Sequence, residues 1–381
     1  MSAMMMLAAP WVVAASATPG AVMPRPADIL AATRRVADWQ VAHAGEMSRR
    51  VPGRWGIDNP RDWQQATFWV AMTELADRDP RYRPVLLELG RAQQWRLGDR
   101  PFHADDQLIG QVWAWAARHG AGAGALAPTR AYFDNVLANR PGNALAFVPS
   151  DKGGDPPCTT RWCWCDALFM APATWLQLSR ATGDPRYARF AHEEFAATKD
   201  YLFDPGEHLF FRDSRFIDRR DEAGRKLFWS RGNGWVMGGL VRIIETLDRR
   251  DPARARYVAL FREMAARIVT LQRPDGYWAP SLLDNGPGTL PETSGTGFFV
   301  YAFARGIDLG IIDRPTYLPA ALRGWGALNR AIQPDGMIGW VQQVSDRPDS
   351  VAQGDTQFYG SGAFVLAGTA LYDLARHGGA R

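Results

Sequence analysis

The sequence predicts an all-α protein, an (α/α)6 barrel in which six helical hairpins form a toroid. Three observations lead to this fold class. Pro-containing junctions that begin helices recur along the chain, apolar helices alternate with amphipathic ones, and Pro-Asp-Gly turns follow two of the amphipathic helices. An inner ring of apolar helices surrounded by an outer ring of amphipathic helices accounts for all three.

The junctions place the helix starts. Two of them read Asp79-Pro80-Arg81-Tyr82 and Asp184-Pro185-Arg186-Tyr187. An acidic residue before a proline in the first turn is a good helix start, because the carboxylate caps free N–H groups and proline needs no partner there. Looser copies lie at Ala127-Pro128, Asp251-Pro252 and Arg314-Pro315. Together with the other patterns they predict a single domain over residues 27–377, with helices that begin near residues 28, 60, 80, 103, 128, 162, 185, 231, 252, 293, 315 and 358.

The helices differ in how apolar they are. Segments 234–240, 295–300 and 360–365 open with glycine and run into apolar residues, which is typical of interior helices. Segment 257–271 carries apolar residues at three-to-four spacing and is expected outside. Strands are expected only in short hairpins such as Leu209–Phe216.

Composition limits the possible partners. Hydrophobic residues make up 46% of the 381 residues, so the chain can bury a large core. The formal net charge is only +4 and no basic run occurs, which argues against a nucleic-acid partner. The 16 tryptophans, several of them near Gly and Asp, favour a cleft lined by aromatic rings.

The N-terminus resembles a targeting segment. Residues 1–23 contain a short apolar run followed by Ala15-Ser16-Ala17, which resembles a cleavage site but lacks a basic start. Read as a signal peptide, the segment predicts export to the periplasm; read as a disordered terminus, it predicts a cytoplasmic protein. The run is too short to span a bilayer, so no membrane insertion is expected.

The three cysteines leave two interpretations open. Cys163 and Cys165 are separated by one residue rather than the two found in common zinc motifs, so no metal site is expected. The cysteines are either small buried side chains, or Cys158 forms a disulfide with one of the other two.

Two segments carry the chemistry. Segment 162–172 sets Asp166 among indoles and aliphatic side chains, where desolvation would raise its pKa and let it hold a proton near neutral pH. Segment 229–235 places Arg231 among similar aromatics, and a guanidinium binds a carboxylate through two hydrogen bonds. An acid, a cation and aromatic platforms together suggest an acidic oligosaccharide as the substrate.

These segments resemble known enzymes. The chain is similar to the unsaturated rhamnogalacturonyl and glucuronyl hydrolases of glycoside hydrolase families 105 and 88, and more closely to family 105. The resemblance rests on Trp164-x-Asp166-x-x-Phe169-Met170, Leu209-Phe210-Phe211, Arg231-Gly232-Asn233-Gly234-Trp235 and Glu292-Thr293-Ser294-Gly295-Thr296. It implies hydrolysis of lyase-generated oligosaccharides by hydration of the C4–C5 double bond in the terminal uronic acid, without a cofactor or metal.

The resemblance also assigns roles. It implies that Asp166 is the proton donor and water activator, although Asp166 also suits an N-cap of the following helix. The second carboxylate is either Asp105 or Asp106. Arg231 matches the family's arginine, with an ion pair to a nearby Asp as the alternative. The other expected substrate contacts are Trp164, Trp235, Asn233, His103, Arg212 and Met170. Arg212 stands where many family members carry a histidine, which bears on substrate preference.

Two rival functions fit parts of the pattern. A conventional inverting glycosidase would use Asp105 or Asp106 together with Asp166 and would need no unsaturated residue. A non-catalytic carbohydrate-binding protein on the same scaffold would keep the tryptophans and tolerate the loss of Asp166.

Overall fold

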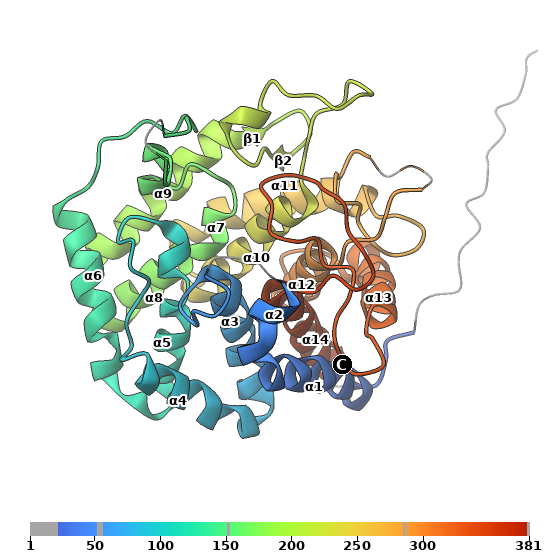
Figure 1. Cartoon of the computed structure of the whole chain (residues 1–381), viewed down its shortest axis with the longest axis horizontal. Helices are drawn as coiled ribbons and strands as arrows, with labels where there is room; N and C mark the ends of the chain where they lie inside the picture. Colours follow the sequence, from blue (N-terminus) through green and yellow to red (C-terminus); the bar gives the residue numbers. More distant parts are fainter. Residues whose placement is uncertain (1–21, 52–55, 151–152, 285, 287, 379–381) are drawn as a thin grey trace, which may run out of the picture.

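A computed structural model describes residues 22–51, 56–150, 153–284, 286 and 288–378. The main helices form two concentric rings, as the sequence predicts (Figure 1). The inner ring consists of α3 (Trp63–Arg78), α5 (Gly110–Ala116), α8 (Pro172–Thr182), α10 (Ser230–Thr246), α12 (Thr293–Asp308) and α14 (Phe358–Gly378). The outer ring consists of α1 (Pro26–Ala42), α4 (Arg83–Ala92), α6 (Ala127–Ala138), α9 (Pro185–Leu202), α11 (Arg254–Thr270) and α13 (Arg314–Arg330).

The ring is closed by the last helix. Each inner helix packs against the next, and α14 packs against both α3 and α1. Figure 1 shows the dark red α14 beside the blue α1. Two further short helices, α2 (Met47–Arg50) and α7 (Ala167–Met170), lie in the connections.

The predicted junctions begin outer helices. Asp184 precedes Pro185 and accepts a hydrogen bond from the Arg186 N–H, and Asp313 caps α13 in the same way. These carboxylates satisfy N–H groups that have no partner within the helix. The Asp79 junction instead forms a 3-10 turn, Pro80–Tyr82, directly before α4.

The two Pro-Asp-Gly turns join neighbouring hairpins. Gly276 adopts φ 91° and Gly336 φ 106°, values that favour glycine. The second turn packs on α1: the Trp39 indole N–H donates to Asp335 at 3.0 Å, and Arg35 donates to the Pro334 carbonyl. This contact links the last hairpin to the first.

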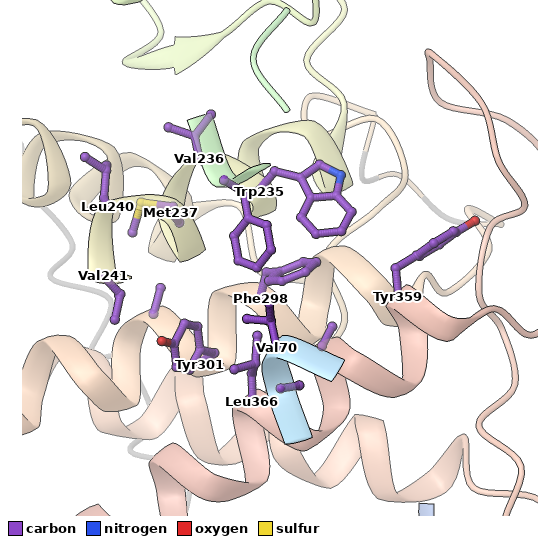
Figure 2. Packing of buried hydrophobic residues seen from close by; sticks show 14 of the residues in the cluster. Val70, Trp235, Val236, Met237, Leu240, Val241, Phe298, Tyr301, Tyr359 and Leu366 are labelled. Atoms are coloured by element: carbon purple, nitrogen blue, oxygen red, sulfur yellow. The ribbon is translucent and has the colours of Figure 1, made fainter. Parts of the chain in front are cut away.

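The interior is aromatic. Trp235 of α10 and Phe298 of α12 are fully buried with ring centroids 4.4 Å apart, and Tyr359 of α14 packs nearby (Figure 2). The small residues that open the inner helices permit this packing: a Cβ at Gly234 would lie 3.0 Å from the Cβ of Phe298. Most tryptophans therefore support the core, and only some reach the cleft.

The predicted hairpin at Leu209–Phe216 is displaced. The antiparallel strands are β1 (Phe203–Asp204) and β2 (Leu209–Phe210), with Phe203 opposite Phe210. Residues Ser214–Phe216 form a 3-10 turn, because the Asp213 carboxylate caps the Arg215 N–H instead of continuing the strand. The predicted targeting segment, residues 1–23, falls almost entirely outside the described residues.

Candidate active site

A polar cleft opens at the end of the barrel where the inner helices begin. An outer cavity of about 450 Å³ and an inner cavity of about 180 Å³ share the lining residues Trp63, Asp105, Trp164, Arg212 and Val344, so they form one cleft. The inner cavity is also lined by Asp166, Met170, Trp229, Arg231, Trp235 and Ser345.

Asp166 lies at the inner end of the cleft and is 8% exposed. Burial raises its pKa, opposed by the charge of Arg212 and by a hydrogen bond that the Cys165 thiol donates at 3.3 Å. The residue occupies the N-cap position of α7, but its side chain makes no capping hydrogen bond. The carboxyl group is therefore not used for capping and faces the cavity as a proton-holding group.

Asp105 and Asp106 can now be separated. Asp105 lines both cavities, its Oδ1 is buried without a hydrogen-bond partner among the described residues, and burial raises its pKa well above the usual range. Asp106 instead accepts hydrogen bonds from the Arg100 side chain at 2.6 and 3.0 Å and from the Arg100 N–H at 2.8 Å. Asp105 is thus the second carboxylate of the cleft, and Asp106 anchors Arg100.

His103 and Trp164 form part of the outer wall, with ring centroids 4.8 Å apart. The His103 Nδ1 accepts a hydrogen bond from the Asp105 N–H at 3.3 Å. Burial, with the nearby charge of Arg100, lowers the pKa of His103 to about 3. His103 is therefore neutral at neutral pH and carries its proton on Nε2.

Arg231 lies in the first turn of α10 and is almost fully buried. Its two terminal nitrogens donate to the carbonyls of Gln342 at 2.6 Å and Gln343 at 2.9 Å. The guanidinium lies over the rings of Trp229 and Tyr359, and its Nε has no hydrogen-bond partner among the described residues. The sequence predicted either a guanidinium free to bind a substrate carboxylate or an ion pair with an Asp. The structure instead shows hydrogen bonds to the backbone of segment 342–343.

Arg212 is the cation nearest the acid. Its Nε lies 3.7 Å from the Asp166 Oδ2, and its Nη1 donates to Asp213 at 2.7 Å. Burial lowers the pKa of Arg212, but the charges of Asp166 and Asp213 outweigh it, so the guanidinium stays charged. Since Arg212 lines both cavities, the arginine at the family's histidine position sits in the cleft.

Asn233 is held by the backbone. Its Oδ1 accepts from the Phe210 N–H at 2.8 Å, and its Nδ2 donates to the carbonyls of Phe210 and Trp229 at 3.0 and 3.1 Å. The side chain is fully buried and joins β2 to α10. Asn233 is not among the residues that line either of the two cavities described above. The amide therefore serves the hairpin, contrary to the predicted substrate contact.

Other residues that line the cleft are Trp63, Asp62, Val344 and Ser345, and the last three were missed by the sequence interpretation of the site. Trp63 lines both cavities and stacks on Tyr359 at 5.3 Å. Asp62, which caps α3, lines the outer cavity, and burial raises its pKa. Trp63 is the first residue of the inner helix α3. Val344 and Ser345 come from the long connection before α14, which loops over the central helices in Figure 1 and has no motif.

The cysteines complete the wall. Cys158 and Cys163 are joined in a disulfide across the 3-10 helix Pro157–Thr160, and Cys165 is a buried free thiol. The two cysteines directly precede Thr159 and Trp164 in the sequence, and both of these residues line the outer cavity. No group of three His, Cys, Asp or Glu side chains suited to a metal occurs among the described residues. In that same part of the chain, no helix is long and apolar enough to cross a membrane.

Comparison with known sequences identifies the family. Residues 32–375 match the sequence model of glycosyl hydrolase family 88. The chain belongs to this family. It is therefore a glycoside hydrolase, as the motifs around Asp166 and Arg231 predict.

Three similar proteins extend the comparison. Unsaturated 3S-rhamnoglycuronyl hydrolases from Alteromonas sp. (strain LOR) and Formosa agariphila are 37% and 33% identical; the alignments cover 88% and 83% of this chain and 83% and 85% of theirs. A solved structure, a family 88 glycosyl hydrolase from Bacteroides vulgatus, superposes with a TM-score of 0.79 at 24% identity. That match covers 92% of this chain and all of the other, and it supports the predicted (α/α)6 fold.

Proposed function

We propose that this hydrolase removes the 4,5-unsaturated terminal uronic acid from lyase-generated oligosaccharides in which that residue is linked to rhamnose. The names of the two 37% and 33% identical relatives support this substrate. The observation that carries the proposal is Asp166, a buried carboxyl with a raised pKa at the inner end of a cleft that also holds Asp105. A carboxyl in that state can give a proton to carbon and take one back from water.

The proposed reaction needs one acid and one water. The Asp166 carboxyl protonates C4 of the vinyl ether, and positive charge develops at C5 and the ring oxygen. The Asp166 carboxylate then takes a proton from water while the water oxygen bonds to C5. The resulting hemiketal opens and releases the remaining oligosaccharide, and Asp166 is again protonated for the next cycle.

The other lining residues have proposed roles in binding. Arg212 and the free Nε of Arg231 offer positive charge to the uronate carboxylate. Trp164 and Trp235 border the inner cavity as apolar platforms, and the Nε2 proton of His103 is available in the outer one. Asp105 favours its neutral form and would donate a hydrogen bond to a sugar oxygen.

A conventional inverting mechanism fits this site less well. It requires one carboxylate to act as an ionised base for water. Burial raises the pKa of both Asp105 and Asp166, and the effect on Asp105 is strong. Burial therefore disfavours, at both residues, the ionised base that an inverting pair needs.

Isotope labelling tests the reaction. Hydration in D2O places deuterium at C4 of the released 4-deoxy sugar, and oxygen-18 water places its label at C5. Loss of the double-bond absorbance reports the rate. Oxygen-18 at the anomeric carbon without deuterium at C4 would instead establish conventional hydrolysis and rule out the proposal.

We also propose export of the protein to the periplasm. The disulfide between Cys158 and Cys163 supports an oxidising compartment, because such bonds are rare in reducing cytosol. Fractionation of cells that express the full chain, with N-terminal sequencing of the mature protein, tests this. An intact N-terminus in the cytoplasmic fraction would contradict it.

A further inference from the structure

One oxygen of the Asp166 carboxylate, Oδ2, contacts both the Cys165 thiol and the Arg212 guanidinium. The Cys165 thiol donates to Oδ2 at 3.3 Å, and the Arg212 Nε lies 3.7 Å from that same Oδ2. The two contacts come from different segments, one directly before α7 and one after β2. Because both contacts are made to Oδ2, the two oxygens of the carboxylate have different surroundings.

Both contacts are held in place by the surrounding structure. The Cys165 N–H donates to the Arg212 carbonyl at 2.8 Å, so the two segments are joined. Gly232 of α10 packs on the thiol, since a Cβ there would lie 3.1 Å from the Sγ. The Arg212 guanidinium is fixed by Asp213, which is fully buried and also accepts from Arg215. The thiol donates a hydrogen bond to Oδ2, the guanidinium contacts it as an ion pair, and neither group can move away without disturbing these contacts.

A hydrogen bond and a nearby positive charge on one oxygen make a carboxyl group asymmetric. Hydrogen bonding and positive charge stabilise negative charge where they act, so protonation is disfavoured at Oδ2 and favoured at Oδ1. We propose that Cys165 and Arg212 are positioning residues that reserve Oδ2 of Asp166 for charge and Oδ1 for the proton that is transferred. This inference rests on the proposed function of Asp166 as acid and base.

The proton balance follows from this assignment. The Oδ1–H bond breaks as the C4–C5 double-bond electrons form a C4–H bond, and the electron pair left on the carboxylate is stabilised at Oδ2 by the thiol and the guanidinium. Water then gives its oxygen to C5 and one proton to Oδ1. The same oxygen therefore delivers and recovers the proton.

The pH profile reports these contacts. The described groups that face Asp166 are the Cys165 thiol, the Arg212 and Arg231 cations, and Asp105. The thiol hydrogen bond and both arginines lower the pKa of Asp166, against burial. Because the first step uses the protonated acid, kcat/KM falls as pH rises through this pKa. Cys165→Ala removes a donor to the carboxylate and moves the fall to higher pH, by about half a unit or more.

Matched variants separate this effect from a loss of packing. Cys165→Ser keeps a donor and retains the wild-type pH profile. Ser361→Ala deletes another buried donor, which bonds Gln40 and lies outside the described cleft lining, and it leaves the alkaline limb unchanged. An unshifted limb in Cys165→Ala, or equal shifts in Cys165→Ala and Ser361→Ala, would overturn the proposal.

Infrared spectroscopy gives a readout that does not need turnover. Cys158 and Cys163 form the disulfide, so Cys165 carries the chain's one S–H group, and burial raises the pKa of this thiol well above the usual range. We expect its S–H stretch to move to lower frequency as Asp166 ionises, and Asp166→Asn to abolish that titration. A pH-independent S–H band would refute the thiol contact even if the enzyme is active. A titrating band without turnover of unsaturated uronides would refute the proposed function instead.

Discussion

Replacing Asn233 by alanine tests how the hairpin beside the active site is held. The amide pairs with both backbone groups of Phe210, as a neighbouring strand would, and both residues are fully buried. Asn233→Ala leaves the Phe210 N–H and C=O without these partners, at a cost of about 1–2 kcal/mol each within the range for buried groups. The expected loss of stability is therefore about 2–4 kcal/mol.

The expected shift in melting temperature follows from chain size. An unfolding entropy of about 2.1 cal/mol/K per residue amounts to about 0.8 kcal/mol/K for 381 residues, so Asn233→Ala melts about 3–5 °C lower. Differential scanning calorimetry measures this. The control is Asn139→Ala, since Asn139 also bonds nearby groups but is exposed, and it should melt within about 1 °C of the wild type. Equal melting of the two variants would refute the anchoring role, and an unchanged melt with a raised KM would restore Asn233 as a substrate contact.

Four further predictions concern the cleft. Asp166→Asn lowers kcat by about a hundred- to ten-thousand-fold, measured by loss of the double-bond absorbance, with the fold retained in circular dichroism. Asp105→Asn raises the melting temperature at pH 7 but not near pH 4. Burial raises the pKa of Asp105 in the folded state, so the folded state binds more protons than the unfolded state. The stability of the wild type therefore falls as the pH rises above the pKa of Asp105 in the unfolded state, and the asparagine variant avoids this loss. Arg231→Lys raises KM more than a retained charge implies, because lysine cannot bridge the carbonyls of Gln342 and Gln343, and wild-type kinetics would exclude Arg231 from the site. Cys158→Ser, which opens the disulfide beside Thr159, lowers the melting temperature and raises KM, and wild-type values for both would contradict a role of the bond in shaping the outer wall.

Local signals predicted the helices well. An Asp directly before a proline marks a helix start because its carboxylate caps free N–H groups, and α9 begins at such a junction. The looser Arg314-Pro315 junction begins α13, where Asp313 is the cap. Glycine-rich starts identified the inner helices because close packing leaves no space for a Cβ there. The hairpin was misplaced because Asp213 suits the end of a strand and the cap of a turn equally well, and only the fold selects the cap.

The cleft was predictable where one motif carries both position and chemistry. Asp166 is such a case, whereas the place of Arg231 was predicted but its hydrogen bonds to the carbonyls of Gln342 and Gln343 were not. The choice between Asp105 and Asp106 depends on which side of a single turn meets Arg100, and sequence spacing does not encode that. Similarly, Asn233 belongs to a motif that faces the cleft, yet its own side chain points to β2.

The closure of the barrel by α14 has a consequence for biosynthesis. Two of the helices that pack on α14, α1 and α3, leave the ribosome before the other main helices described, and they meet α14 only after residues 358–378 have emerged. Until then the ring of helices in the nascent protein is open, and apolar surfaces at its two ends are exposed to solvent. Such exposed surfaces promote aggregation and are the kind that chaperones bind. A premature stop before Phe358 therefore yields a chain that has synthesised Asp105, Asp166 and Arg231 but cannot assemble them around an enclosed interior.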